Sequence, residues 1–209
     1  MSRFGEDPRA FFDLVYTDAA PWDVGAAQPA LTALFDEHPP EGPVLDAGCG
    51  TGDLAIEVAR RGLSVLGVDF VEAAVAEARE RAAALPPGSA DRLAFAVGDA
   101  LHPSALGREF GAVVDSGFFH LFDQETRDRF AEELAGAIRP GGRYYLLAFA
   151  VEFPVPNTPL KVTEEELRAR FSREAGWRTL ALRPATFESR IAPVPAVAAC
   201  FERLPPARP

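Results

Sequence analysis

The sequence predicts an α/β fold built on a doubly wound sheet, in which mostly parallel strands carry helices on both faces. From Val44 onward, short apolar segments alternate with segments whose apolar residues recur at helical spacing. The first apolar segment, Val44-Leu45, runs directly into a glycine-rich turn from Gly48 to Gly52. The chain has 209 residues, 48% of them hydrophobic and 25% charged, which suits one domain with a sizeable core.

The predicted elements follow in order along the chain. Residues 1–40 carry aromatic residues among turn formers and a helical pattern from about Gln28 to Glu37. The strands that alternate with helices are predicted at Val44–Leu45, Leu63–Val68, Leu93–Val97, Phe110–Asp115 and Tyr144–Phe149. The helices are predicted from Leu54 to a C-terminal cap at Gly62, over Val71–Ala84, from an Asp123 N-cap to Ile138, and from a Thr163–Glu166 capping box to Ser172.

The C-terminal part predicts a different arrangement. Trp177–Leu182 and Thr186–Ile191 both alternate apolar and polar residues, and Arg183-Pro184-Ala185 lies between them. This spacing predicts an antiparallel hairpin added to the parallel sheet. Residues 192–209 are then expected to form a C-terminal tail.

Charge and cysteine content narrow the function classes. The formal charge of -10 argues against a general binder of nucleic acid or of anionic membranes, whose phosphates it would repel. Two cysteines cannot make a disulfide framework, so we expect a cytoplasmic protein. No apolar stretch near 18 residues occurs, and no membrane span is predicted.

Chemistry is expected at the strand ends, because ligands of doubly wound sheets bind outside the carboxyl ends of the strands. The first strand end reads Asp46-Ala47-Gly48-Cys49-Gly50. Its glycines allow a ligand to approach the backbone closely. They fall at relative positions 1, 3 and 5, whereas the dinucleotide-binding pattern has them at 1, 3 and 6. Asp46 would repel a phosphate and suits an amino group.

The next two strand ends also carry carboxylates. Asp69 follows Gly48 by 21 residues (69 − 48), the distance at which an acid accepts hydrogen bonds from ribose hydroxyls, although it could also cap the next helix. Phe70 could lie against an adenine ring or simply pack in the core. Asp99 could accept from an exocyclic amine or cap a turn.

Taken together, these motifs resemble those of class I S-adenosylmethionine-dependent methyltransferases, from about residue 40 to 191. The resemblance rests on Val44 to Gly52, Asp69, Gly98-Asp99-Ala100, Asp115 and Arg139-Pro140-Gly141-Gly142. It implies a Rossmann-like seven-stranded sheet of order 3-2-1-4-5-7-6 with strand 7 antiparallel. It further implies that the Asp46–Gly50 loop, Ala47 and Cys49 included, holds the methionine part of the cofactor, Asp69 the ribose, and Asp99 with Ala100 the adenine.

The N-terminal region is similar to one branch of this family. Pro21-Trp22-Asp23 resembles a segment of thiopurine-methyltransferase-like enzymes, which act on small molecules. The resemblance implies that Trp22 covers the cofactor and that the helix before it forms a lid. We therefore expect a single methyltransferase domain over residues 1–209, with a lid at 1–40, the cofactor-binding sheet and helices at 41–191, and the tail at 192–209.

The implied reaction converts S-adenosylmethionine to S-adenosylhomocysteine while methylating O, N or S of a small aromatic, heterocyclic or quinone-like molecule. Asp115 and His120 are candidate catalytic bases; Asp115 could instead contact the cofactor's amino group, and His120 could contact substrate or be a packed core residue. The aromatic residues expected around the substrate, together with His120, are Phe12, Tyr16, Phe119 and Phe149. No metal site is predicted from the histidine and cysteine spacings.

Other functions remain open at this stage. A nicotinamide-dependent oxidoreductase is disfavoured by the glycine spacing and by Asp46. A noncatalytic cofactor-binding protein of the same fold would carry the same motifs. The expected partner is a small methyl acceptor, with no nucleic acid and no membrane, and the protein could be a monomer or a homodimer.

Overall fold

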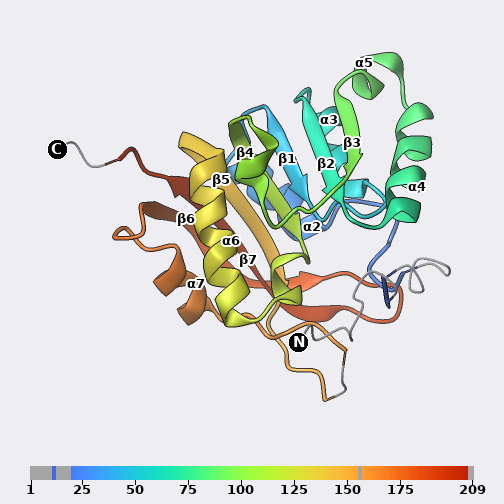
Figure 1. Cartoon of the computed structure of the whole chain (residues 1–209). Coiled ribbons are helices and arrows are strands. Elements are labelled where there is room, and N and C mark those ends of the chain that lie inside the picture. Colours follow the sequence, from blue (N-terminus) through green and yellow to red (C-terminus); the bar gives the residue numbers. More distant parts are fainter. Residues whose placement is uncertain (1–10, 13–19, 155–156, 207–209) are drawn as a thin grey trace.

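A seven-stranded mixed sheet organises the molecule, which we describe from a computed structural model (Figure 1). The structure describes residues 11–12, 20–154 and 157–206. The strands lie in the order β3-β2-β1-β4-β5-β7-β6, as the resemblance implied. Their bounds are β1 Val44–Ala47, β2 Val65–Asp69, β3 Leu93–Val97, β4 Phe110–Ser116, β5 Ile138–Phe149, β6 Trp177–Phe187 and β7 Val194–Arg203.

The strand directions explain where a ligand can bind. β1 pairs in parallel with both β2 and β4, while β2 also pairs in parallel with β3, and β4 with β5. β7 is inserted between β5 and β6 and is antiparallel to both, which confirms the predicted antiparallel strand. The chain leaves β1 towards β2 on one side, whereas β4 pairs with β1 on the other. The order in which successive strands are added to the sheet therefore reverses between β1 and β4. In such sheets a ligand-binding crevice forms beyond the carboxyl ends of the strands at this point.

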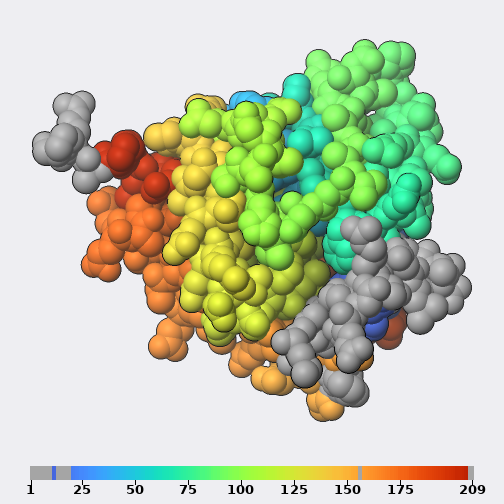
Figure 2. Space-filling view, viewed as in Figure 1, coloured from blue at the N-terminus to red at the C-terminus, as the bar shows by residue number. Residues whose placement is uncertain are grey.

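Helices cover both faces of the sheet, as predicted. One core joins α2, α3 and α4 to the sheet, and a second core joins α6 and α7 to the opposite face. Figure 2 shows α6 and the segment between β3 and β4 covering one of these faces. The helices are α2 Pro29–Glu37, α3 Asp53–Arg60, α4 Glu72–Ala83, α5 Pro87–Ala90, α6 Gln124–Ala137 and α7 Glu164–Arg170, with 3-10 turns η1 Pro103–Leu106 and η2 Phe119–Leu121.

Local sequence signals set the helix ends. The Asp123 side chain accepts a hydrogen bond from the Thr126 backbone N–H at 2.9 Å and caps α6. Thr163 and Glu166 form the predicted capping box at the start of α7. Gly62, just after α3, has a φ of +88°, a conformation that few residues other than glycine adopt easily. These three predicted helix boundaries are confirmed.

The predicted C-terminal elements need correction. β6 is one strand over Trp177–Phe187, continuing through Pro184, and its partner β7 lies at Val194–Arg203 rather than at Thr186–Ile191. The expected tail over 192–209 is therefore wrong for residues 194–203. Pro184 is tolerated because β6 is an edge strand, where a missing N–H need not break a ladder. β7 is buried from Ala196 to Phe201, so it lacks the alternation that reveals a half-exposed strand.

None of the helices in the described part of the chain combines the length and apolar character that a membrane span requires.

Candidate functional site

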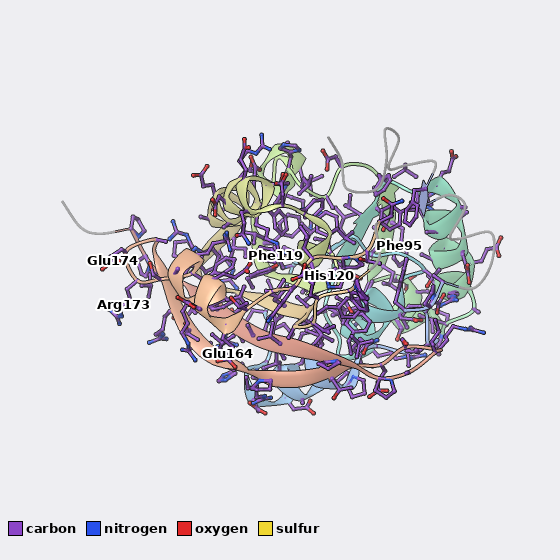
Figure 3. All side chains as sticks on the ribbon, turned by 90° about the horizontal axis from the view of Figure 1, so that it is seen from below. Phe95, Phe119, His120, Glu164, Arg173 and Glu174 are labelled. Carbon is purple, nitrogen blue, oxygen red and sulfur yellow. The ribbon has the colours of Figure 1, made fainter. Side chains whose placement is uncertain are left out.

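A pocket lies beyond the carboxyl ends of β1, β2, β4 and β5. Five residues before α2 also contribute to its wall, namely Trp22, Asp23, Ala26, Ala27 and Gln28, as does Phe187 at the end of β6. Figure 3 shows His120 and Phe119 near the middle of the molecule, whereas the exposed residues Arg173 and Glu174 lie at its edge. The lining residues are Phe12, Trp22, Asp23, Ala26, Ala27, Gln28, Asp46, Gly48, Cys49, Gly50, Thr51, Asp53, Leu54, Asp69, Phe70, Val71, Ser116, Gly117, Phe118, His120, Leu121, Phe149, Pro159 and Phe187.

The glycine-rich turn after β1 forms the floor of the pocket. Gly48 has a φ of +68°, and a Cβ placed on it would lie 2.4 Å from Cδ2 of Phe118. The residue must therefore be glycine for two independent reasons, conformation and space. The backbone N–H of Gly50 donates to Oδ2 of Asp69 at 2.9 Å, which joins the turn to the end of β2. The predicted loop thus lies on the pocket, with Gly48, Cys49 and Gly50 in its wall.

Asp46 brings an unpartnered carboxylate oxygen to this floor. Its side chain is 1% exposed, and Oδ2 has no hydrogen-bond partner among the described residues. Burial raises its pKa to about 8, the backbone N–H of Ala55 opposes this, and the nearby carboxylates of Asp115 and Asp69 raise it further. A buried acceptor without a donor is costly unless a ligand supplies one. Asp46 is therefore suited to a cationic donor group, such as an ammonium.

Asp69 lies at the end of β2, where the sequence predicts it. Its Oδ2 accepts from Gly50 and its Oδ1 from the Val71 backbone N–H, both at 2.9 Å. Burial raises the pKa of this carboxyl, and these backbone N–H groups partly offset the effect. Each oxygen retains a further lone pair for hydroxyl donors of a ligand. Asp69 therefore both caps the turn before α4 and faces the pocket, so the two roles weighed from the sequence are compatible.

Two aromatic residues from the N-terminal region cover this part of the pocket. Phe12 meets Phe70 edge-to-face at 5.6 Å between ring centroids and lies 6.3 Å from the Trp22 ring. All three rings line the pocket. The contacts expected from the sequence, of Trp22 and Phe70 with the cofactor and of Phe12 with the substrate, stay predictions. The predicted lid helix before Trp22, and Tyr16 with it, lie outside the described residues.

Asp99 is not brought into this pocket. Its carboxylate is 60% exposed, accepts from the Leu101 backbone N–H at 2.9 Å and pairs with Nδ1 of His102 at 2.9 Å. Ala100 and Ala47 are buried and do not line the pocket either. The turn-capping alternative for Asp99 is therefore what the structure contains, and its contact with adenine stays a prediction.

Asp115 and Phe119 also require correction, because neither lines the pocket. Both Asp115 oxygens are already used: Oδ1 accepts from the Phe118 backbone N–H at 2.8 Å, while Oδ2 accepts from the Phe119 backbone N–H at 3.0 Å and the Tyr144 hydroxyl at 2.8 Å. Burial raises its pKa to about 7 in spite of these donors. Asp115 thus shapes the loop that follows β4 and is poorly placed to act as a base.

The Phe119 ring faces the second core, where it packs on Phe130 and Phe171 and under the guanidinium of Arg127. It has no exposed surface. The pocket is lined instead by its neighbours in the loop, Phe118 and His120. The sequence predicts the six residues from Asp115 to His120 at the end of a strand, but it could not show which side chains of the 3-10 turn face the pocket.

His120 and Phe149 form the opposite wall. Their rings stack at 4.3 Å with an interplanar angle of 22°, and the Phe187 ring lies 4.9 Å from Phe149. The Phe149 backbone N–H donates to Nδ1 of His120 at 3.0 Å. Burial, with the positive charge of Arg127, lowers the pKa of His120 to about 3. The imidazole is therefore neutral at physiological pH.

An ionic cluster that the sequence did not predict fastens the segment before α2 to the pocket. Arg81 donates to Asp23 at 2.9 Å, to Asp53 at 3.0 Å and to the Thr51 hydroxyl at 3.1 Å. The Thr51 hydroxyl itself donates to Asp23 at 2.9 Å. The cluster joins α4, the start of α3 and the Pro-Trp-Asp segment. The sequence motif included Asp23, but nothing in the sequence indicated that Arg81 would be its partner.

The same segment is also attached to the β6–β7 loop. The Gln28 side-chain amide donates to the Glu188 carbonyl at 2.9 Å and accepts from its N–H at 2.7 Å, and the Arg190 backbone N–H donates to the Pro21 carbonyl at 2.8 Å. Residues 21–28 therefore close one side of the pocket. No sequence signal links positions 160 residues apart.

Comparison with known proteins identifies the family. A family model described as "Methyltransferase domain" matches residues 44–142, from β1 into β5. A "2-heptyl-1-hydroxyquinolin-4(1H)-one methyltransferase" of Mycobacteroides abscessus is 32% identical over 155 residues, which are 73% of this chain and 67% of that protein. The chain belongs to the class I S-adenosylmethionine-dependent methyltransferases.

Two further relatives add detail to this assignment. "Thiocyanate methyltransferase 1" of Arabidopsis thaliana is 30% identical over 148 residues, 69% of this chain and 63% of that protein. A solved structure from work on the "conversion of a disulfide bond into a thioacetal group during echinomycin biosynthesis" superposes with a TM-score of 0.80 at 28% identity, covering 96% of this chain and 93% of that one. The matches span about two thirds of the length of the two curated relatives.

The pocket of this methyltransferase fits the family's cofactor, S-adenosylmethionine. The unpartnered Oδ2 of Asp46 offers an acceptor for an ammonium group, and Asp69 offers lone pairs for ribose hydroxyls. At Gly48 the backbone itself forms the floor, because a side chain there would collide with Phe118. Carboxylates and aromatic faces are also the groups that stabilise a sulfonium cation.

Proposed function

We propose that this methyltransferase transfers the methyl group of S-adenosylmethionine to O, N or S of a small aromatic, heterocyclic or quinone-like molecule. The observation that carries the proposal is the division of one pocket into two chemically distinct parts. Carboxylates and glycines lie at the ends of β1 and β2, whereas His120, Phe149 and Phe187 lie at the ends of β4, β5 and β6. One part suits a polar cation and the other a planar apolar molecule.

The cofactor would be held by Asp46, the Gly48–Gly50 turn, Asp69 and Phe70, and covered by Trp22. When bound, it supplies an electrophilic methyl group on a sulfonium. The chain's own contribution is to hold the acceptor in line with that group and to exclude water, for which the attached segment at residues 21–28 and the aromatic wall are suited. No described residue needs to change its covalent state.

One of the relatives, the mycobacterial protein, supports a small aromatic acceptor. The mycobacterial protein is described as acting on a 2-heptyl-1-hydroxyquinolone, a bicyclic planar molecule, and its match with this chain covers 73% of the chain. Phe149 and Phe187, with His120, present ring faces and edges on which such a molecule can stack. Added recognition domains for a macromolecule are not needed for such a substrate.

The experiment is an incubation of the full chain with S-adenosylmethionine and a panel of phenols, thiols, quinones and N-heterocycles, with products detected by mass. We expect at least one acceptor to gain one methyl group. Asp69→Asn should reduce the yield, whereas Asp91→Asn, an exposed residue outside the pocket, should leave it unchanged. Cofactor binding without any methylated acceptor would favour the second candidate, a noncatalytic cofactor-binding protein.

We also propose that the chain acts as one domain in the cytoplasm, as a monomer or homodimer. Both cysteines, Cys49 and Cys200, are free and buried, which is compatible with a reducing compartment. The two cores share one sheet, which favours one folding unit.

A further inference from the structure

We propose that His120 is a hydrogen-bond donor to the methyl acceptor, and that the acceptor must arrive already ionised. The substrate class is then planar molecules with an acidic N-hydroxy, enol or aryl thiol group, which lose their proton in water before binding. This inference rests on the proposed function and deepens it. From the sequence, His120 could be a base, a substrate contact or a packed core residue, and a donor role excludes the first of these.

The hydrogen bond to Phe149 fixes the tautomer of His120. A backbone N–H can only donate, so Nδ1 must accept with its lone pair, at 3.0 Å. In a neutral imidazole the proton is then on Nε2. A histidine in this form can donate from Nε2 and has no lone pair left with which to remove a proton.

The protein also disfavours the protonated form of the ring. His120 is 3% exposed, and the guanidinium of Arg127, from α6, is the charged group that acts on it. The rings of Phe149 and Phe187 also lie close to the imidazole. To act as a base His120 would have to become a buried cation beside an arginine, which desolvation and repulsion both oppose.

The edge of the ring that carries Nε2 faces the end of β4. A Cβ placed on Gly117, whose φ is +88°, would lie 3.2 Å from Cε1 and 3.3 Å from Nε2 of His120. Gly117 and His120 both line the pocket, and Nε2 has no hydrogen-bond partner among the described residues. A donor is thus left free beside the aromatic wall.

The carboxylates of the described part of the chain do not supply a base on this side. Asp115 has both oxygens occupied by the loop and Tyr144, while Asp23 and Asp53 are paired with Arg81. Asp46 and Asp69 line the pocket at the ends of β1 and β2. In the sheet, β4 separates β1 from β5, where Phe149 forms the acceptor wall.

An ionised acceptor needs no base. Its lone pair forms the new bond to the methyl carbon while the carbon–sulfur bond of the cofactor breaks, and that electron pair goes to sulfur. The negative charge of the acceptor and the positive charge of the sulfonium cancel, and no proton remains to be removed. The Nε2–H of His120 orients the anion before transfer and selects against acceptors that lack a hydrogen-bonding atom at this position.

The first test reads the histidine directly and requires no turnover. Protein labelled with ¹⁵N-histidine should show His120 as the neutral Nε2–H tautomer from pH 5 to pH 9, assigned with His120→Gln, a range chosen to bracket the ordinary histidine pKa of about 6.5. Addition of 1-hydroxyquinolin-4(1H)-one as the probe should shift the Nε2 signal. A titration near the ordinary pKa, or a proton on Nδ1, would overturn the proposal.

The second test separates a donor from a base by kinetics. Across a series of substituted thiophenols, the inflection in the pH profile of kcat/KM should move with the pKa of the acceptor. His120→Leu should lower kcat/KM by about 10- to 100-fold, the size of one hydrogen bond to a charged group, and His120→Gln, which retains an N–H donor, should lose less. An inflection at one pH for all acceptors, with equal losses in the two variants, would contradict it. If no acceptor is methylated, the proposed function fails, while the ¹⁵N spectra still decide the tautomer.

Discussion

Replacing Asp46 by asparagine should stabilise the ligand-free protein and weaken its binding of S-adenosylmethionine. The carboxylate is 1% exposed, and its Oδ2 has no partner among the described residues, so without cofactor the protein contains a group whose charged form is disfavoured. Asparagine has nearly the same shape and no charge to bury. Stability and cofactor binding should therefore change in opposite directions, which is the signature of a residue kept for its ligand.

The magnitude follows from proton linkage. The pKa of Asp46 is about 8 in the folded protein, against 3.8 for an ordinary aspartate. Because the folded-state pKa is raised, the stability contributed by the protonated form is fully present below pH 3.8 and is lost as pH rises towards 8. At pH 7 the accumulated loss is about 4 kcal/mol, which corresponds to roughly 10 °C in Tm for a chain of this size.

Thermal unfolding of the wild type and Asp46→Asn, measured from pH 4 to pH 8.5, tests this reasoning. The two melting temperatures should be close at pH 4, where both side chains are neutral, and should diverge as pH rises. Asp91→Asn, a substitution at an exposed carboxylate, should follow the wild type throughout. A gap that does not depend on pH, or an Asp46→Asn protein that melts below the wild type at pH 8, would refute the account of this residue.

Three further predictions concern the same pocket. Gly48→Ala should destabilise the fold by about 1–3 kcal/mol and abolish measurable cofactor binding, since the new Cβ would lie 2.4 Å from Phe118 at a positive φ; denaturant unfolding that matches the wild type would contradict this. Arg81→Met should raise KM for S-adenosylmethionine about tenfold with a smaller change in kcat, because Asp23 loses its cation and the segment before α2 loses its attachment. Steady-state kinetics measure both constants, and an unchanged KM would show that the ionic cluster does not support cofactor binding. Asp69→Asn should weaken S-adenosylmethionine binding by about tenfold or more, measured by calorimetry, as charge-assisted hydrogen bonds become neutral ones, and an unchanged affinity would remove Asp69 from the site.

The part of the site that could be predicted from the sequence is the part that depends on neighbours along the chain. Asp46 and the glycine turn are consecutive, and Asp69 follows from the usual length of a strand–helix–strand unit, so local pattern was sufficient. The strand order came from the family resemblance, because no local signal says which strands pair.

The sequence could not show how side chains within one short turn divide between core and pocket. His120 lines the pocket, Phe118 lines the pocket and also belongs to the second core, and Phe119, between them, belongs to the second core and does not line the pocket. A 3-10 turn repeats every three residues, so adjacent positions diverge, and only the packing of α6 and α7 decides which ring is covered. The same holds for Asp115, whose partners come from the loop after β4 and from Tyr144 on the next strand.

The limits of the C-terminal strands were also invisible in the sequence. β7 is covered on both faces and consists largely of small apolar residues, so its pattern does not alternate. Pro184 suggested a turn, yet it lies on an edge strand where it is harmless. In both cases tertiary position overrode the local signal.

The central claim, that the pocket at the ends of β1 and β2 holds S-adenosylmethionine, is tested most directly by calorimetric titration of the cofactor into the full chain. The account predicts saturable binding with about one cofactor per chain, the stoichiometry of a single pocket. It also predicts that Asp46→Asn weakens this binding although the variant is the more stable protein. Absence of binding at millimolar cofactor, or binding that Asp46→Asn leaves unchanged, would contradict it.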